Sequence, residues 1–153
     1  MLDGMRLSQQ AQYAICGMFD LAYAGDEAPV QVRVIGERQR IPPRYLEQIF
    51  QRLRKAELVR GKRGPGGGYV LARPPAEISL RDILEAVEGP LADGFAQGPP
   101  PHERRTPERP NFVWREIGAS IEGVLTGLTL AELCRRAAAS GVRRPPGEAM
   151  YHI

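Results

Sequence analysis

The sequence contains only two cysteines, and it has no long run of apolar residues. Cys16 and Cys134 lie too far apart to resemble a disulfide framework or the paired spacing that binds zinc. No apolar run approaches the ~20 residues of a membrane-spanning helix. The opening residues MLDGMRLSQQ also lack the apolar segment of a secretory signal. We therefore expect a cytoplasmic protein whose thiols are reduced.

Histidine is equally scarce, because His102 and His152 are the only two in the chain. No nucleophile, base and acid occur together in a recognisable arrangement, so we expect no enzymatic activity. A chain of 153 residues can bury one ordinary core, or one small domain with an extension used for association.

Positive charge is concentrated in one part of the chain. The formal net charge is only +3, but residues 38–63 contain nine basic residues and two acidic ones, Glu47 and Glu57. Such a patch favours a polyanionic partner, although an ordinary solvated helix face could produce the same cluster.

The first half of the chain has the pattern of a helix-turn-helix. Residues 7–24 form an amphipathic pattern with Ser8 as its N-cap, and a shorter helix is expected at 31–39. Pro42 and Pro43 then occupy positions where a helix can start without losing a hydrogen bond. The helix expected at 43–55 has one apolar face, formed by Leu46, Ile49, Phe50 and Leu53. Two short helices joined by a tight turn are typical of a helix-turn-helix, whose second helix enters the major groove.

The segment RGPGGGYVL separates two short β-compatible runs at 58–62 and 69–71. A phosphate-binding loop would lead from a strand into a helix and show a P-loop or dinucleotide-binding motif, and this segment does neither. We therefore interpret it as the loop of a β-hairpin, a wing that presents Arg60, Lys62 and Arg63 to phosphates or to a narrow minor groove.

The second half begins with a helix at 79–88, where Ser79 and Asp82 indicate a capping box. Residues 90–110 are rich in proline, glycine and charge, which is typical of a flexible loop. A strongly apolar helix follows, with Asn111 as its expected N-cap, and Thr129 with Glu132 indicates a second capping box. The apolar residues of the long helix keep a near-heptad spacing: Val113, Trp114, Ile117, Ile121, Val124, Leu125 and Leu128. Part of this face could pack on the N-terminal module, and the rest most simply packs on the same helix of a second subunit.

Three segments of the sequence closely resemble bacterial Rrf-type winged-helix transcription regulators. They are MRLSQQAQYAI, IPPRYLEQIFQRLRKAELVRGKRGPGGGYVLAR and SLRDILEAVEG, and the likeness continues through FVWREI and LTLAEL to about residue 138. The resemblance implies a mainly α fold with a small β-hairpin: a winged helix-turn-helix domain plus a long C-terminal dimerisation helix. It implies a homodimer that binds double-stranded DNA at operators with two-fold symmetry. The chain would then divide into a DNA-binding domain (1–89), a loop (90–110), the dimerisation and short C-terminal helices (111–139) and a tail (140–153).

The resemblance also assigns the DNA-binding residues. The recognition helix is 43–55, whose N-terminal half presents Arg44, Tyr45, Glu47 and Gln48 to base edges. Glu47 could accept from a cytosine amino group, or it could be a surface carboxylate paired with Arg44 or Arg54. The remaining expected DNA contacts are to the backbone, from helix and wing: Gln51, Arg52, Lys55, Arg60, Lys62, Arg63, Gly64, Gly66 and Gly67.

Many members of the resembled family hold an iron-sulfur cluster with three cysteines in the loop before the long helix. Here that loop has no cysteine, and ungapped registration puts Ala96, His102 and Glu108 at the three positions. Thiolates are the usual cluster ligands because they are soft and anionic, so we expect no cofactor. A cluster or a single metal ion held by His102 and Glu108 without cysteine is the alternative.

We therefore expect a homodimeric, sequence-specific transcription regulator, a repressor, that does not depend on a cysteine-ligated cluster. Its signal stays open between a thiol switch at Cys16 or Cys134, a small-molecule or protein effector, and no ligand at all. The alternative function is a winged-helix protein-interaction module without DNA binding. Such a module should expose aromatic or aliphatic side chains on helix 43–55 instead of Arg, Gln and Lys.

Overall fold

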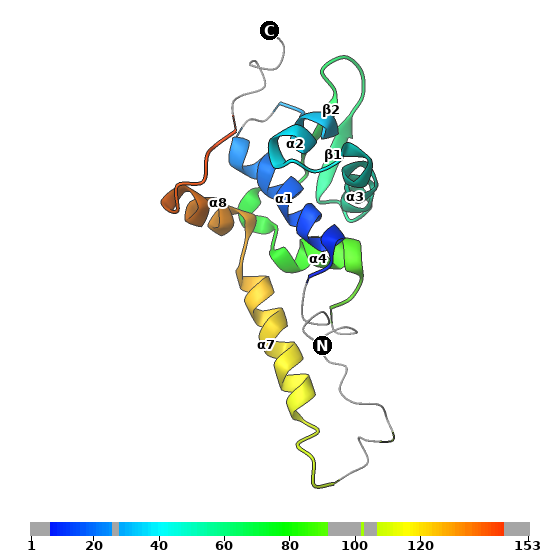
Figure 1. Cartoon of the computed structure of the whole chain (residues 1–153), viewed down its shortest axis with the longest axis vertical. Coiled ribbons are helices and arrows are strands. Elements are labelled where there is room, and N and C mark those ends of the chain that lie inside the picture. Colours follow the sequence, from blue (N-terminus) through cyan, green and yellow to red (C-terminus); the bar gives the residue numbers. More distant parts are fainter. Residues whose placement is uncertain (1–6, 26–27, 92–101, 103–106, 146–153) are drawn as a thin grey trace.

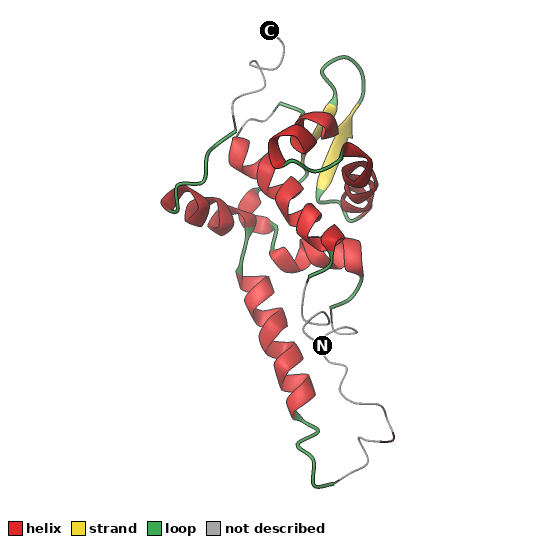
Figure 2. Cartoon of the chain, viewed as in Figure 1, coloured by secondary structure: helices red, strands yellow, loops and turns green. Residues whose placement is uncertain are grey.

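The computed structural model describes residues 7–25, 28–91, 102 and 107–145. Within these ranges the chain is mainly helical, with one two-stranded hairpin (Figures 1 and 2). The elements, in chain order, are α1 (Gln9–Ala24), α2 (Val32–Gln39), α3 (Pro43–Lys55), β1 (Val59–Lys62), β2 (Gly68–Leu71), η2 (Pro75–Glu77), α4 (Leu80–Glu88), α7 (Val113–Gly127) and α8 (Leu130–Ala139). The expected fold class, a winged helix-turn-helix followed by a long helix, is confirmed.

The helix ends follow from local sequence. Ser8 accepts a hydrogen bond from the Ala11 amide at the start of α1, and Gly25 ends that helix in the left-handed conformation. At α4, Ser79 and Asp82 form the reciprocal capping box that the sequence predicted.

Of the two caps predicted in the C-terminal half, the one at Asn111 was wrong and the one at Thr129 was right only in part. Helix α7 begins after Phe112, so Asn111 is not its N-cap. At α8, Thr129 does accept from the Glu132 amide, but the Glu132 side chain does not complete a capping box. It binds Arg135 and Arg136 instead, at 2.6 and 3.0 Å, and these hydrogen bonds lower the pKa of Glu132 to about 2.

One buried core joins α1–α4, the hairpin and α8. The four apolar residues predicted for the inner face of α3 are all buried, and so is Leu130 of α8. Helix α8 therefore packs back onto the N-terminal module, whereas α7 extends away from it (Figure 1). The predicted domain boundaries stay a prediction.

The base of α7 is fixed by backbone hydrogen bonds. Leu80 donates to the Leu128 carbonyl oxygen at 2.9 Å, and Leu130 donates to the Ile78 carbonyl oxygen at 2.8 Å. Through these bonds the junction between α7 and α8 pairs with the residues that open α4. The direction of α7 is therefore coupled to the N-terminal module.

A buried ion pair holds the first two helices together. Asp20 of α1 is 0% exposed and accepts hydrogen bonds from Arg38 (2.6 Å) and Gln39 (3.1 Å) at the end of α2. Burial raises the pKa of the Asp20 carboxyl, and the hydrogen bonds from Gln39 and Arg38 oppose that rise. The pair therefore fixes the helix that precedes the turn into α3.

None of the helices in the described ranges combines the length and the apolar character that a bilayer crossing requires.

Candidate nucleic-acid interface

The outer face of α3 is polar and exposed along its whole length. Its exposed residues include five of the predicted DNA contacts: Arg44, Glu47, Gln48, Gln51 and Lys55. Large aliphatic side chains on this helix are confined to the buried face. Tyr45, at 40% exposure, is the one large aromatic side chain on this face. The other exposed residues are suited to hydrogen bonding with base edges and phosphates.

Arg44 and Tyr45 form a small unit at the start of α3. The guanidinium of Arg44 lies 4.8 Å from the centre of the Tyr45 ring and donates to its hydroxyl at 3.1 Å. The Tyr45 ring also approaches Tyr13 of α1, with 6.1 Å between ring centres. Such contacts reduce the rotamer freedom of both side chains before any DNA is bound.

Glu47 lies exposed in the same row, and among the described residues no ion pair joins it to Arg44 or Arg54. Arg44 is engaged with Tyr45 instead. The carboxylate can therefore accept from a donor presented by a ligand.

Arg52, unlike the other predicted DNA contacts on α3, is hydrogen-bonded to α1 and α4. Its guanidinium donates to the side chain of Gln10 at 2.7 Å and to the carbonyl oxygen of Val87 at 3.2 Å. These bonds tie α3 to the start of α1 and the end of α4. A DNA contact by Arg52 stays a prediction, and the structure gives this side chain a role inside the module.

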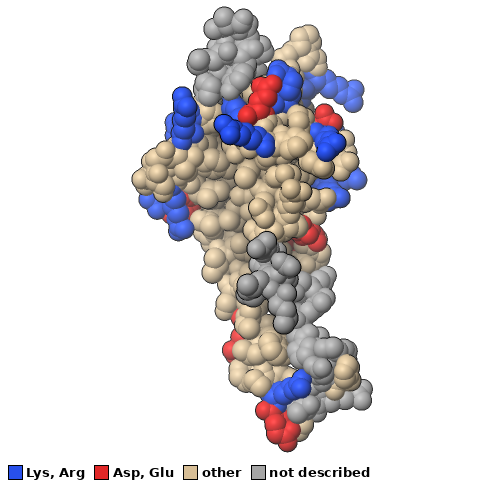
Figure 3. All heavy atoms as spheres, in the orientation of Figure 1, with Lys and Arg blue, Asp and Glu red and all other residues tan. Residues whose placement is uncertain are grey.

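The hairpin has the predicted antiparallel pairing, from Val59 opposite Leu71 to Lys62 opposite Gly68. Its basic side chains are all exposed: Arg60, Lys62 and Arg63. Glycine is required at its tip, since Gly64 has φ +95° and a Cβ on Gly67 would lie 2.4 Å from the Lys62 carbonyl oxygen. In Figure 3, Lys and Arg side chains gather at the end of the molecule that carries the hairpin.

The hairpin is anchored to the start of α2, a contact that sequence analysis missed. Val30 and Tyr69 exchange two backbone hydrogen bonds, of 3.0 and 2.9 Å, and the Tyr69 ring packs on Phe50 of α3. Gly68 permits this approach, because a Cβ there would lie 2.4 Å from the backbone of Val30. The wing and α3 therefore share one rigid support.

Comparison with known proteins shows which family the chain belongs to. The family model Rrf2, described as an iron-dependent transcriptional regulator, matches residues 7–136. The chain belongs to the Rrf2 family. It is 40% identical over 129 residues to the HTH-type transcriptional regulator IscR of Serratia proteamaculans, covering 84% of this chain and 79% of that protein.

Solved structures agree with the family. The IscR structure from T. potens superposes with a TM-score of 0.72 at 35% identity and covers 99% of both chains. CymR of B. subtilis, the global cysteine regulator, gives a TM-score of 0.70 at 29% identity, with 86% of this chain and 97% of that chain covered. The protein is therefore a transcriptional regulator with a winged-helix DNA-binding fold, and it is not an enzyme.

In this Rrf2-family chain one part of the apolar stripe of α7 packs on the core and another part is exposed to solvent. Leu125 and Leu128 pack against the buried core, whereas Ile117 and Val124 are 45% and 67% exposed. The other predicted dimerisation residues are partly buried: Val113, Trp114 and Ile121. A projecting helix with exposed aliphatic side chains is a surface suited to cover by another protein surface.

Among the described residues, the two thiols of this Rrf2-family chain lie in different helices, away from the predicted cluster position. Cys16 lies in α1 and Cys134 in α8, both half-buried, and burial raises the pKa of each thiol, which disfavours the thiolate. His102 and Glu108 are exposed, and Ala96 lies outside the described residues. Across the part of the chain that the structure describes, no three His, Cys, Asp or Glu side chains are grouped to hold a metal ion.

Proposed function

We propose that the protein is a homodimeric, sequence-specific DNA-binding regulator whose DNA binding does not depend on an iron-sulfur cluster. The observation that carries the proposal is the exposed polar face of α3 beside a rigidly supported basic wing. Helix α3 enters the major groove and the wing lies in the adjacent minor groove, the geometry of winged helix-turn-helix proteins.

The exposed side chains divide into two tasks. Arg44, Tyr45, Glu47 and Gln48 on the N-terminal half of α3 face base edges and supply specificity. Basic residues of the wing and of the end of α3 face phosphates and supply affinity that falls with salt: Lys55, Arg60, Lys62 and Arg63.

Dimerisation follows from the exposed stripe on α7. A second copy of the chain presents the same stripe, and a two-fold contact between the two helices would cover Ile117 and Val124 in both subunits. Two recognition helices related by this axis would read an operator with two-fold symmetry.

Independence from a cluster follows from the donor set. Iron-sulfur clusters are usually held by thiolates, and the two thiols of the chain lie in different helices with their pKa values raised. We assign it the action of a repressor, in which the dimer bound at an operator blocks other proteins from that site.

Glu47 provides the test of sequence-specific reading. Replacing Glu47 with Gln should change the preferred base at one position in each half-site, by ~1–3 kcal/mol, because an amide presents a donor where the carboxylate only accepts. The measurement is selection of binding sites from random duplex DNA with the wild-type and variant proteins.

Glu77→Gln is the control, because Glu77 is an exposed carboxylate in η2, away from α3. It should leave the selected sequence unchanged. If Glu47→Gln and the wild type select the same sequence, Glu47 does not contact a base and is only a charged residue on the surface.

A further inference from the structure

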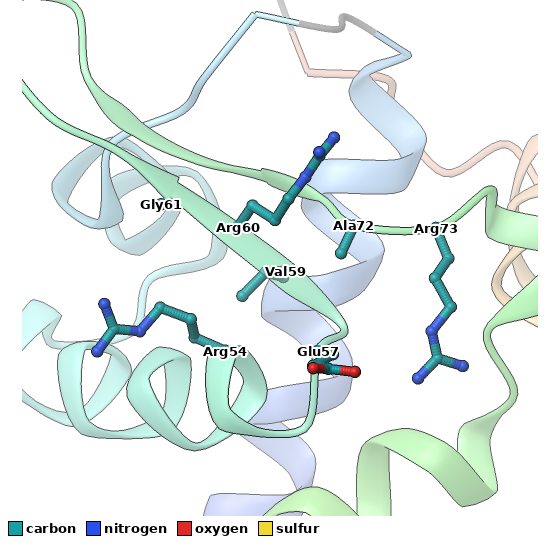
Figure 4. Close-up of a pocket in the computed structure, with 7 residues that line it drawn as sticks. All are labelled: Arg54, Glu57, Val59, Arg60, Gly61, Ala72 and Arg73. Atoms are coloured by element: carbon teal, nitrogen blue, oxygen red, sulfur yellow. The ribbon is translucent and has the colours of Figure 1, made fainter.

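A hollow of about 610 Å³ lies between α3 and the open edge of β1. We call it the α3–β1 hollow, and Figure 4 shows the residues that line it: Arg54, Glu57, Val59, Arg60, Gly61, Ala72 and Arg73. Three arginines and one glutamate give it a net positive charge. Sequence analysis assigned neither Arg54 nor Gly61 to DNA.

The three arginines of the hollow point in different directions. In Figure 4 the side chain of Arg54 extends into the space between α3 and β1, on the side where the helix and the strand lie farther apart. Arg73 follows β2 at the opposite end of the hollow, and its guanidinium points toward the end of α3, where it donates to the Ala56 carbonyl oxygen at 3.5 Å. Arg54 is exposed, and among the described residues it takes part in no ion pair.

The edge of β1 that borders the hollow carries unpaired backbone groups. The Ala72 amide donates to the Leu58 carbonyl oxygen at 3.0 Å. In an antiparallel pair, hydrogen-bonded and non-hydrogen-bonded residues alternate, so the backbone N–H and C=O groups of residues 58, 60 and 62 point toward β2. Tyr69, opposite Gly61, turns its own backbone groups to Val30. The Gly61 amide therefore lies on the open edge, where it can donate to a ligand, and Gly61 is exposed.

We propose that the α3–β1 hollow seats a phosphate of the DNA backbone, held by the Arg54 guanidinium and the Gly61 amide. This rests on the proposed function, in which α3 occupies a major groove and the wing the adjacent minor groove. One sugar-phosphate strand separates those two grooves, and it must cross the angle between α3 and β1. Guanidinium and backbone amide groups are both common phosphate donors.

Glu57 explains why the hollow suits a backbone phosphate better than a free one. Its carboxylate lines the same hollow, at the end away from the Arg54 guanidinium, and lowers the attraction of the hollow for a free anion. A DNA strand is held in place by the contacts of α3 on one side and the wing on the other, so its phosphate can take up the donors of Arg54 and Gly61 alone.

The test compares Arg54→Gln, Arg54→Lys and Arg73→Gln. Affinity for a fixed operator duplex is measured over a series of salt concentrations. Arg54→Gln should make the slope of log affinity against log salt shallower by ~0.9 for each phosphate that is no longer neutralised, or ~1.8 for a dimer with one such phosphate at each subunit. Arg54→Lys should keep the wild-type slope. Arg73→Gln removes the same charge from the same hollow and should also keep it, because its side chain points away from the strand.

A second measurement locates the phosphate. Uncharged methylphosphonate groups are placed one at a time along the operator. One position in each half-site should weaken wild-type binding and have no further effect on Arg54→Gln. A slope unchanged by Arg54→Gln, or an equally weakened affinity in Arg54→Gln and Arg73→Gln, would overturn the phosphate seat. The proposed function would survive that result, whereas a wild-type protein without salt-dependent DNA binding would contradict the function itself.

Discussion

Replacing Val124 with Glu should convert the dimer into monomers and weaken binding to a two-fold-symmetric operator by ~10²–10⁴-fold. Val124 is the most exposed of the predicted dimerisation residues in α7, at 67%. In the proposed dimer it is buried against a second copy, so the variant would bury two carboxylates without partners. Each monomer would then bind a single half-site without the advantage of two linked binding events.

Ala119→Glu is the matched control. Ala119 lies in the same helix, is exposed, and lies on the face opposite the exposed aliphatic residues. It should remain dimeric and bind the operator normally. The measurements are molar mass in solution by light scattering and titration of operator DNA. If Val124→Glu stays dimeric with unchanged affinity, this face of α7 is not the dimer interface.

Replacing Asp20 with Ala should lower the free energy of unfolding by ~3–5 kcal/mol. The Arg38 side chain is only 7% exposed, and the change removes the buried carboxylate that accepts from its guanidinium at 2.6 Å. The end of α2 would lose its hydrogen bonds to α1, and with them the position of the turn into α3. DNA affinity should fall in proportion to the unfolded fraction and recover on cooling.

Glu37→Ala breaks an ion pair of similar length in the same helix, the 2.8 Å contact between Arg33 and Glu37. Both side chains of that pair are more than half exposed, so the expected cost is only ~0–1 kcal/mol. Chemical denaturation of the two variants measures both values. Equal, small decreases in stability would mean that the buried pair does not hold α1 and α2 together.

The elements of the fold could be predicted because their signals are local. The start of α3 was predicted from its prolines and its buried face from the apolar spacing, and both agree with the structure, as do the bounds 43–55 that the resemblance implied. The caps at Ser8 and Ser79 depend on residues within three positions of each hydroxyl, so they too could be read from the sequence.

The remaining features depend on partners far away in sequence. Arg52 looked like any exposed arginine of a recognition helix, and its bonds to Gln10 and Val87 exist only after α1 and α4 pack around α3. A division of the apolar stripe of α7 between the module and a second subunit was weighed from the sequence, but the residues that face the core could not be named, because they depend on the backbone bonds at Leu128.

The same reasoning applies to the candidate site. The wing and its basic residues could be predicted from the glycine-rich segment. The anchor of the wing could not be predicted, because it joins Val30 and Tyr69, which are far apart in the sequence. The direction of Arg54 was also hidden, because it depends on the angle between α3 and β1 in the folded chain.

The most direct test of the central claim is selection of binding sites from random duplex DNA by protein shown to be free of iron and acid-labile sulfide. The proposed function predicts that iron-free dimers enrich one sequence with two-fold symmetry and bind it with an affinity that iron and sulfide loading does not change. Failure to enrich any sequence, or enrichment only by an iron- and sulfide-loaded fraction, would contradict it.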